Sequence, residues 1–208
     1  MIRGIVAALC LLFGTSVSAL ASEPLYVLMD ASGSMAGGGP GEVARLRTAE
    51  AMVRDELAAV SPESQVSITY VGGENGGSCT SPVQISPLQP GSQTLVPMQA
   101  SGSTPLASAL LALAEGAAPG PGRILLITDG ADTCGGDVCA AWAQLNAQRP
   151  ELQLETQLLS PDPGDADRLG CLGNRSTGAV AIEEVSASAE ETVRMDLRWW
   201  QSLTDAQA

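Results

Sequence analysis

The chain has 208 residues and a formal net charge of −13, and it contains neither histidine nor lysine. Like charge repels a phosphate backbone, so nucleic acids are excluded as partners, and anionic membrane surfaces are disfavoured for the same reason. Without histidine or lysine, the chain has no nucleophilic triad, Schiff base or phosphate-loop lysine. Much of ordinary enzyme chemistry is therefore excluded, and we expect no enzyme.

The first residues are typical of an export signal. Arg3 gives a positive start, residues 5–13 form an apolar run too short to span a bilayer, and Ala19-Leu20-Ala21 is an A-x-A cleavage pattern. We predict a signal peptide at 1–21 and one domain at 22–208. No later stretch is long and apolar enough to cross a membrane, so the mature chain is expected to be periplasmic or secreted.

Short apolar runs then alternate with helical patterns along the chain. In chain order we first expect a strand at Leu25–Met29, a helix at Glu42–Val60, strands at Gln65–Val71 and Ser81–Ile85, and a helix from Leu106 to Ala117. The second half is expected to hold a strand at Arg123–Thr128, a helix at Asp137–Gln148, a strand at Leu152–Leu159, a short helix at Asp165–Leu172, a strand at Ala179–Glu183 and a helix at Ala189–Leu203.

This alternation predicts an α/β fold, because strands joined through helices make right-handed crossovers within a parallel sheet. We expect a doubly wound, mainly parallel central sheet with helices on both faces. The segment at Ser81–Ile85, which follows a glycine-rich turn, is expected to be one antiparallel edge strand. The chain shows no internal repeat or linker.

Four cysteines remain after the predicted cleavage, namely Cys79, Cys134, Cys139 and Cys171. An even number in an exported chain predicts two disulfides, for which three pairings are possible. Cys134 and Cys139 are the easiest local pair, although spacing alone does not settle the pairing. A zinc site made of the four thiolates is the alternative, and the lack of a C-x-x-C knuckle argues against it.

Oxygen-bearing side chains follow the strands at the edge where open α/β sheets bind ligands. Asp30, Ser32 and Ser34 come after the first strand, Thr104 opens a helix, and Asp129 ends a later strand. Two carboxylates and three hydroxyls suit Mg²⁺, with Mn²⁺ or Ca²⁺ as alternatives. Because the hydroxyls are neutral, the ion would still attract another anionic oxygen. Gly33 is expected to relieve crowding in the first loop.

This pattern resembles the von Willebrand factor A (VWA) family, whose metal-ion-dependent adhesion site pairs a D-x-S-x-S loop with a distant Thr and a distant Asp. Arg45-Leu46 with Ala49, Ser103–Leu106 and Thr133–Cys139 add to the likeness, which spans residues 24–185 and is greatest for bacterial exported members. The resemblance implies a doubly wound, Rossmann-like fold. It also implies direct binding of the metal by the Ser and Thr hydroxyls, while the Asp residues often act through water.

We therefore expect a metal-ion-dependent protein-binding module, in which the ion coordinates a carboxylate of a protein partner. One alternative is a metal-dependent hydrolase or phosphatase with Asp30 as the nucleophile or a metal-activated water. The missing Asp-x-Asp pattern, lysine and histidine argue against it. A further alternative is an ion that stabilises the loops while any partner binds elsewhere.

Three other features have simpler interpretations. Asp132 and Asp137 lie near the expected cleft, but a solvated loop and a helix N-terminus explain them without a metal. Trp199-Trp200 occurs at helical spacing with Val193 and Leu203, which favours packing of the last helix onto the sheet over a binding patch.

Overall fold

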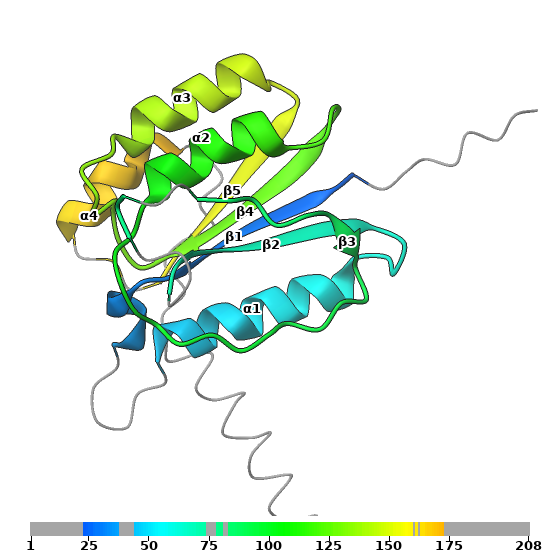
Figure 1. Ribbon diagram of the computed structural model, residues 1–208, viewed down its shortest axis with the longest axis horizontal. Helices are drawn as coiled ribbons and strands as arrows, with labels where there is room; N and C mark the ends of the chain where they lie inside the picture. The colour runs from blue at the N-terminus through cyan, green and yellow to red at the C-terminus, as the bar shows by residue number, and fades with distance from the viewer. Residues whose placement is uncertain are drawn as a thin grey trace, which may run out of the picture.

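A computed structural model of the protein describes residues 23–37, 44–73, 78–80, 83–159, 161 and 163–172. Within these residues one five-stranded sheet has the order β3-β2-β1-β4-β5 (Figure 1). The strands are β1 (Leu25–Ala31), β2 (Gln65–Gly72), β3 (Gln89–Pro90), β4 (Gly122–Thr128) and β5 (Leu152–Leu158). All neighbours pair in parallel except β3, which is antiparallel to β2.

The helices lie on both faces of this sheet. Helix α1 covers one face, and α2 and α3 pack side by side on the other, with α4 beside α3 (Figure 1). Their bounds are α1 (Arg45–Ala59), α2 (Leu106–Gly116), α3 (Val138–Gln148) and α4 (Pro163–Leu169), with 3-10 turns η1 (Gly33–Ala36) and η2 (Gly170–Leu172). The predicted α/β fold, doubly wound around a mainly parallel sheet with one antiparallel edge strand, is confirmed.

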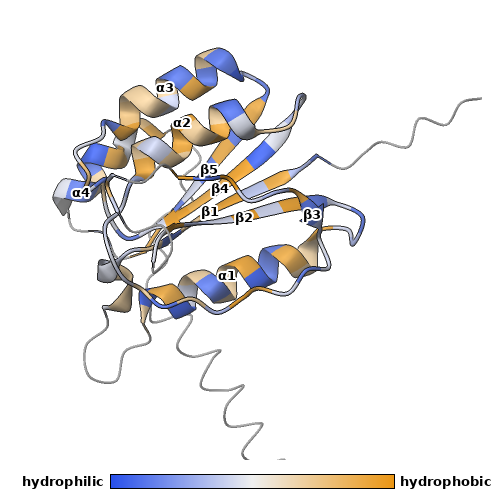
Figure 2. Cartoon of the chain, viewed as in Figure 1, coloured by the Kyte–Doolittle hydropathy of each residue, from blue (hydrophilic) through white to orange (hydrophobic). Residues whose placement is uncertain are grey.

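The central strands owe their position to continuous apolar sequence. Every residue of β1 is buried, and β4 is buried from Ile124 to Thr128, as parallel strands covered on both faces require. Their side chains pack into two separate hydrophobic cores, one on each face of the sheet. Leu28 and Leu126 face α2 and α3, whereas Val27 and Leu125 face α1. Figure 2 shows the hydrophobic residues concentrated in these central strands.

The predicted edge strand at Ser81–Ile85 is wrong where it can be compared. Residues 83–88 form no strand, and the edge position belongs to Gln89–Pro90. The reason lies in two hydroxyls of β2. The Ser67 hydroxyl donates to the Ser86 carbonyl at 2.6 Å, and the Thr69 hydroxyl accepts from the Ser86 N–H at 2.9 Å. Side chains therefore satisfy backbone groups that a strand ladder would otherwise use.

Two disulfides are present, as expected, but they join Cys79 to Cys134 and Cys139 to Cys171. Of the three possible pairings, which the sequence left open, the one with the local pair Cys134–Cys139 does not form. The Asp132 carboxylate binds the N–H groups of Cys134 and Gly136, which fixes the loop before α3. Cys139 already lies in the first turn of α3, which packs against η2, and so it meets Cys171 there.

Several predictions lie outside the described residues. They are the signal peptide at 1–21, the strand at Ala179–Glu183 and the helix at Ala189–Leu203 with Trp199 and Trp200. In the part of the chain that is described, no helix is long and apolar enough to span a membrane.

Candidate metal centre

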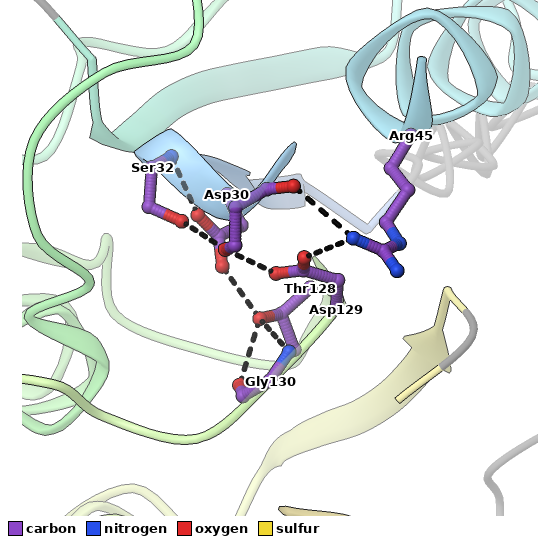
Figure 3. Close-up of polar contacts among 7 residues, drawn as sticks. Asp30, Ser32, Arg45, Thr128, Asp129 and Gly130 are labelled. Carbon is purple, nitrogen blue, oxygen red and sulfur yellow. Dashed lines mark hydrogen bonds and ion pairs between the residues drawn. The ribbon is translucent and has the colours of Figure 1, made fainter. Parts of the chain in front are cut away.

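The carboxyl ends of β1 and β4 are neighbours in the sheet, and four of the five predicted ligands gather beside them. Asp30 is the second-last residue of β1, and Ser32 follows the strand directly. Ser34 lies in the 3-10 turn η1, which turns the chain back over the strand end, and Asp129 follows β4. Residues that follow two strands far apart in the sequence are thereby brought close together (Figure 3).

Hydrogen bonds connect four of the five predicted ligands. Asp30 Oδ1 accepts the Ser32 N–H at 2.8 Å. The hydroxyl oxygens of Ser32 and Ser34 lie 3.0 Å apart, and the Ser34 hydroxyl donates to Asp129 Oδ1 at 2.9 Å. Hydroxyl and carboxylate oxygens from two distant loops therefore face one another, which is the donor set that a hard divalent cation prefers.

Thr104 reaches this region through its backbone. Its N–H donates to the Thr133 hydroxyl at 2.8 Å and its carbonyl accepts the Thr133 N–H at 3.1 Å. Two residues earlier, the Gly102 carbonyl accepts the Gly33 N–H at 3.0 Å. The Thr104 segment is thus bonded to both other loops. Thr104 lies just before α2, whose N-cap position is Pro105 and which has no side-chain cap.

Asp30 is a fully buried carboxylate that faces no basic side chain among the described residues. Its second oxygen, Oδ2, accepts the Thr128 hydroxyl at 2.6 Å. Burial raises its pKa from 3.8 to about 6, the two hydrogen-bonded neighbours lower it, and the charge of Asp129 adds to the rise. A cation beside Asp30 would supply the missing counter-charge, so the residues present fit a divalent metal.

The site contains few charges of its own. Among the described residues, no group of three or more His, Cys, Asp or Glu side chains is placed to hold a metal. The two carboxylates here are supplemented by neutral hydroxyls, so a bound divalent ion would not be over-neutralised. That balance leaves the ion able to attract a further anionic oxygen.

Arg45 is a residue of this site that sequence reasoning noted only as part of a family likeness. Its Nη1 lies 3.3 Å from Asp129 Oδ2 and 3.2 Å from the Ser34 carbonyl oxygen, to which it donates. Figure 3 shows the side chain reaching from the start of α1 towards the Asp129 carboxylate. No spacing rule marks it, because the contact joins residues 84 positions apart.

Glycine at position 72 has a role that was expected of Gly33. A Cβ at Gly33 would meet the Gly102 carbonyl at 3.5 Å, which is ordinary contact, so crowding does not explain that glycine. Gly72, at the end of β2, has φ +89, and a Cβ there would lie 2.8 Å from both Ser103 O and Ser32 N. Gly72 therefore lets the Ser32 and Ser103 segments approach.

Asp132 and Asp137 organise the surrounding loops. Asp132 Oδ1 accepts from Cys134 and Gly136, and Oδ2 accepts the Ala107 N–H at 2.9 Å, so both oxygens are used. Asp137 is the N-cap of α3 and accepts the Ala140 N–H at 2.9 Å. Both fit the non-metal roles expected for them.

Fold and site together define a doubly wound α/β protein with a cluster of hydroxyl and carboxylate side chains, contacted by Arg45, at the carboxyl edge of its sheet. No protein-family model matches the chain, and no curated protein matches its sequence. Among solved structures, the chain is similar to proximal thread matrix protein 1 from the mussel byssus, with 14% identity and a TM-score of 0.52 over 73% of this chain and 41% of that chain.

A second similar structure is the manganese-loaded TRAP protein of Plasmodium vivax, with 14% identity and a TM-score of 0.49 over 80% of this chain and 71% of that chain. This chain spans less than half the length of the byssus protein. At such identities, the byssus likeness supports the fold alone, and the likeness to the TRAP protein adds nothing to it.

Proposed function

We propose that this protein is a metal-ion-dependent protein-binding module of the VWA type. Asp30, Ser32, Ser34, Thr104 and Asp129 would hold one divalent cation, Mg²⁺ in the first place and Mn²⁺ or Ca²⁺ as alternatives. A carboxylate of a protein partner would complete the ion's coordination. The observation that carries the proposal is the hydrogen-bonded series Ser32–Ser34–Asp129 beside the buried Asp30 carboxylate.

The chemistry of the donors explains why such an ion would bind a partner. The serine and threonine hydroxyls are neutral ligands, and the two aspartates would contribute directly or through water. The ion would thus retain net positive charge and an affinity for one more oxygen anion. The protein's net charge of −13 opposes an acidic partner at long range, but salt screens that repulsion over about 10 Å.

Binding is favoured over hydrolysis by the surroundings of Asp30. The side chain is fully buried, and both carboxylate oxygens accept hydrogen bonds, which makes Asp30 a poor nucleophile. The sequence also lacks the histidine and lysine that would move a proton or hold a phosphate. These features support a site that binds a ligand and does not catalyse a reaction on it.

The two disulfides support export of the protein from the cytosol. Two disulfides are characteristic of proteins outside the reducing cytosol, which agrees with a periplasmic or secreted location. The partner would then be a protein of that same compartment.

The test is capture of partners from an extract of the exported compartment, read by mass spectrometry. Wild type is compared with Asp30→Asn, which keeps the side-chain shape, and with Asp137→Asn, which alters a carboxylate outside the site. Capture that needs Mg²⁺, fails in EDTA and fails in Asp30→Asn alone is the expected result. Capture that is indifferent to metal and to Asp30→Asn would reject the proposal and favour a purely structural ion.

A further inference from the structure

Arg45 places a positive charge inside the proposed metal site. Its Nη1 is shared between the Asp129 carboxylate and the Ser34 carbonyl, so one guanidinium group contacts two of the three loops that would supply ligands. The six arginines that the structure describes all form ion pairs with carboxylates, and Arg45 is the one whose partner is a proposed metal ligand.

The structure makes room for this guanidinium. A Cβ at Gly37 would lie 2.8 Å from Arg45 Nη1 and 2.9 Å from the Ser34 carbonyl oxygen, so a larger residue at that position would displace the arginine. Arg45 Nε is buried and has no hydrogen-bond partner among the described residues. Within the described residues, the hydrogen bonds of the head group are therefore those of Nη1.

The Arg45 side chain is partly exposed at the edge of the proposed site. The Arg45 side chain is 29% exposed, and within the described part of the chain its Nη2 donates to no acceptor. Guanidinium groups present paired donors that match the two oxygens of a carboxylate. An anion that approached the ion would therefore find a second cationic contact at the rim of the site.

Charge determines how Arg45 would affect the two kinds of ligand. Asp30 and Asp129 contribute two negative charges when ionised, and Arg45 returns one, which leaves the site with less attraction for a cation. When a divalent ion is bound, the same sum becomes positive and favours an anion. The arginine thus acts in opposite directions on the metal and on the anionic ligand.

We propose that Arg45 is the specificity-determining residue of this site, which weakens metal binding and draws the carboxylate of the partner to the bound ion. This inference rests on the proposed function. It differs from a packing role, because a residue that merely held the two loops together would strengthen the binding of both ligands.

The test uses the full mature protein, Mn²⁺ as the metal and acetate as the carboxylate probe. Mn²⁺ affinity is measured by electron paramagnetic resonance of the free ion, and acetate binding by the relaxation of water protons at the bound ion. The variants are Arg45→Gln, which removes the charge, and Arg45→Lys, which keeps it. Arg54→Gln is the control, because it removes the same charge from an exposed position of the same helix.

Arg45→Gln is expected to bind Mn²⁺ about 3- to 10-fold more tightly and to bind acetate about 10-fold more weakly once Mn²⁺ is loaded. Arg45→Lys should match wild type in Mn²⁺ affinity, and Arg54→Gln should match it in both measurements. If Arg45→Gln leaves both affinities unchanged, or lowers both, the inference is overturned while the metal site stands. If wild type binds Mn²⁺ no more tightly than Asp30→Asn does, the proposed metal site is absent. The proposed function then fails, and this inference fails with it.

Discussion

Ser34 and Asp129 lie 95 positions apart in sequence, and a hydrogen bond of 2.9 Å joins the serine hydroxyl to the aspartate carboxylate. This bond connects the loop after β1 to the loop after β4. It exists because the two strands are neighbours in the parallel sheet, so that their carboxyl ends share one edge. The relationship makes the geometry of each loop depend on the other.

Ser34→Ala removes the hydroxyl from the middle of this connection. Asp129 would lose one of its two side-chain partners and the ion would lose a neutral ligand. We expect metal affinity to fall by about tenfold or more and stability without metal to fall by about 1 kcal/mol. Calorimetric titration with Mg²⁺ or Mn²⁺ and urea unfolding measure the two effects. Unchanged metal affinity would remove Ser34 from the set of ligands.

Asp30→Asn distinguishes the effect of Asp30 on metal binding from its effect on the stability of the metal-free protein. An asparagine oxygen can still accept the Ser32 N–H, and its amide can donate to the Thr128 hydroxyl oxygen, while the buried charge is gone. The metal-free variant should therefore be at least as stable as wild type, because burial disfavours the ionised carboxylate. The rise in melting temperature that saturating Mg²⁺ gives to wild type should disappear.

Differential scanning fluorimetry with and without EDTA measures this prediction. Asp137→Asn is the control and should keep the Mg²⁺-dependent rise, because the asparagine oxygen can still accept the Ala140 N–H at the start of α3. A metal-free Asp30→Asn protein that is several kcal/mol less stable than wild type would mean that the ionised carboxylate supports the fold.

The sequence was informative wherever local pattern decides structure. The apolar runs at residues 25–29 and 123–128 are long enough to be buried on both faces, and two such strands bring their following residues to one edge. For that reason Asp30, Ser32, Ser34 and Asp129 could be grouped from the order of residues alone. Fold class followed from the same alternation of strands and helices.

What sequence missed depends on contacts between loops. Arg45 meets Asp129 only because α1 begins beside the end of β4, and nothing near Arg45 in the sequence carries that information. The disulfides join cysteines that lie 55 and 32 positions apart, and spacing in the sequence does not reveal which of them meet. The edge strand failed because the hydroxyls of β2 bind Ser86 in place of a ladder.

Gly72→Ala tests the close approach of the loops around the first serine. The new methyl group would lie 2.8 Å from Ser103 O and Ser32 N, and the backbone would remain at φ +89, which disfavours any residue with a Cβ. We expect a loss of about 2–4 kcal/mol in unfolding free energy and weaker metal binding. Guanidinium unfolding and Mn²⁺ titration measure the two quantities.

The control for this variant is Gly120→Ala. Gly120 has φ +104, but a Cβ there would meet nothing within 4 Å, so only the backbone term applies. Its loss should be about 1–2 kcal/mol with metal affinity unchanged. Equal losses in the two variants would show that the contact with Ser103 and Ser32 contributes nothing.

The two disulfides should differ in their effect on metal binding. Cys134 follows Thr133, whose hydroxyl and N–H bind the Thr104 backbone, so the bond to Cys79 restrains the segment that would bring Thr104 to the ion. The bond from Cys139 to Cys171 instead joins α3 to η2. Replacing both cysteines of either pair by serine should cost about 3–4 kcal/mol of stability through loop-closure entropy.

Metal affinity is the quantity that separates the two pairs. We expect the variant without Cys79–Cys134 to bind Mn²⁺ at least several-fold more weakly, whereas the variant without Cys139–Cys171 stays close to wild type. Electron paramagnetic resonance titration at a temperature where both variants remain folded, checked by circular dichroism, provides the comparison. A larger loss of Mn²⁺ affinity in the Cys139–Cys171 variant would mean that the contact between α3 and η2 matters more for metal binding. It would argue against Thr104 as a ligand that is held in position through Thr133.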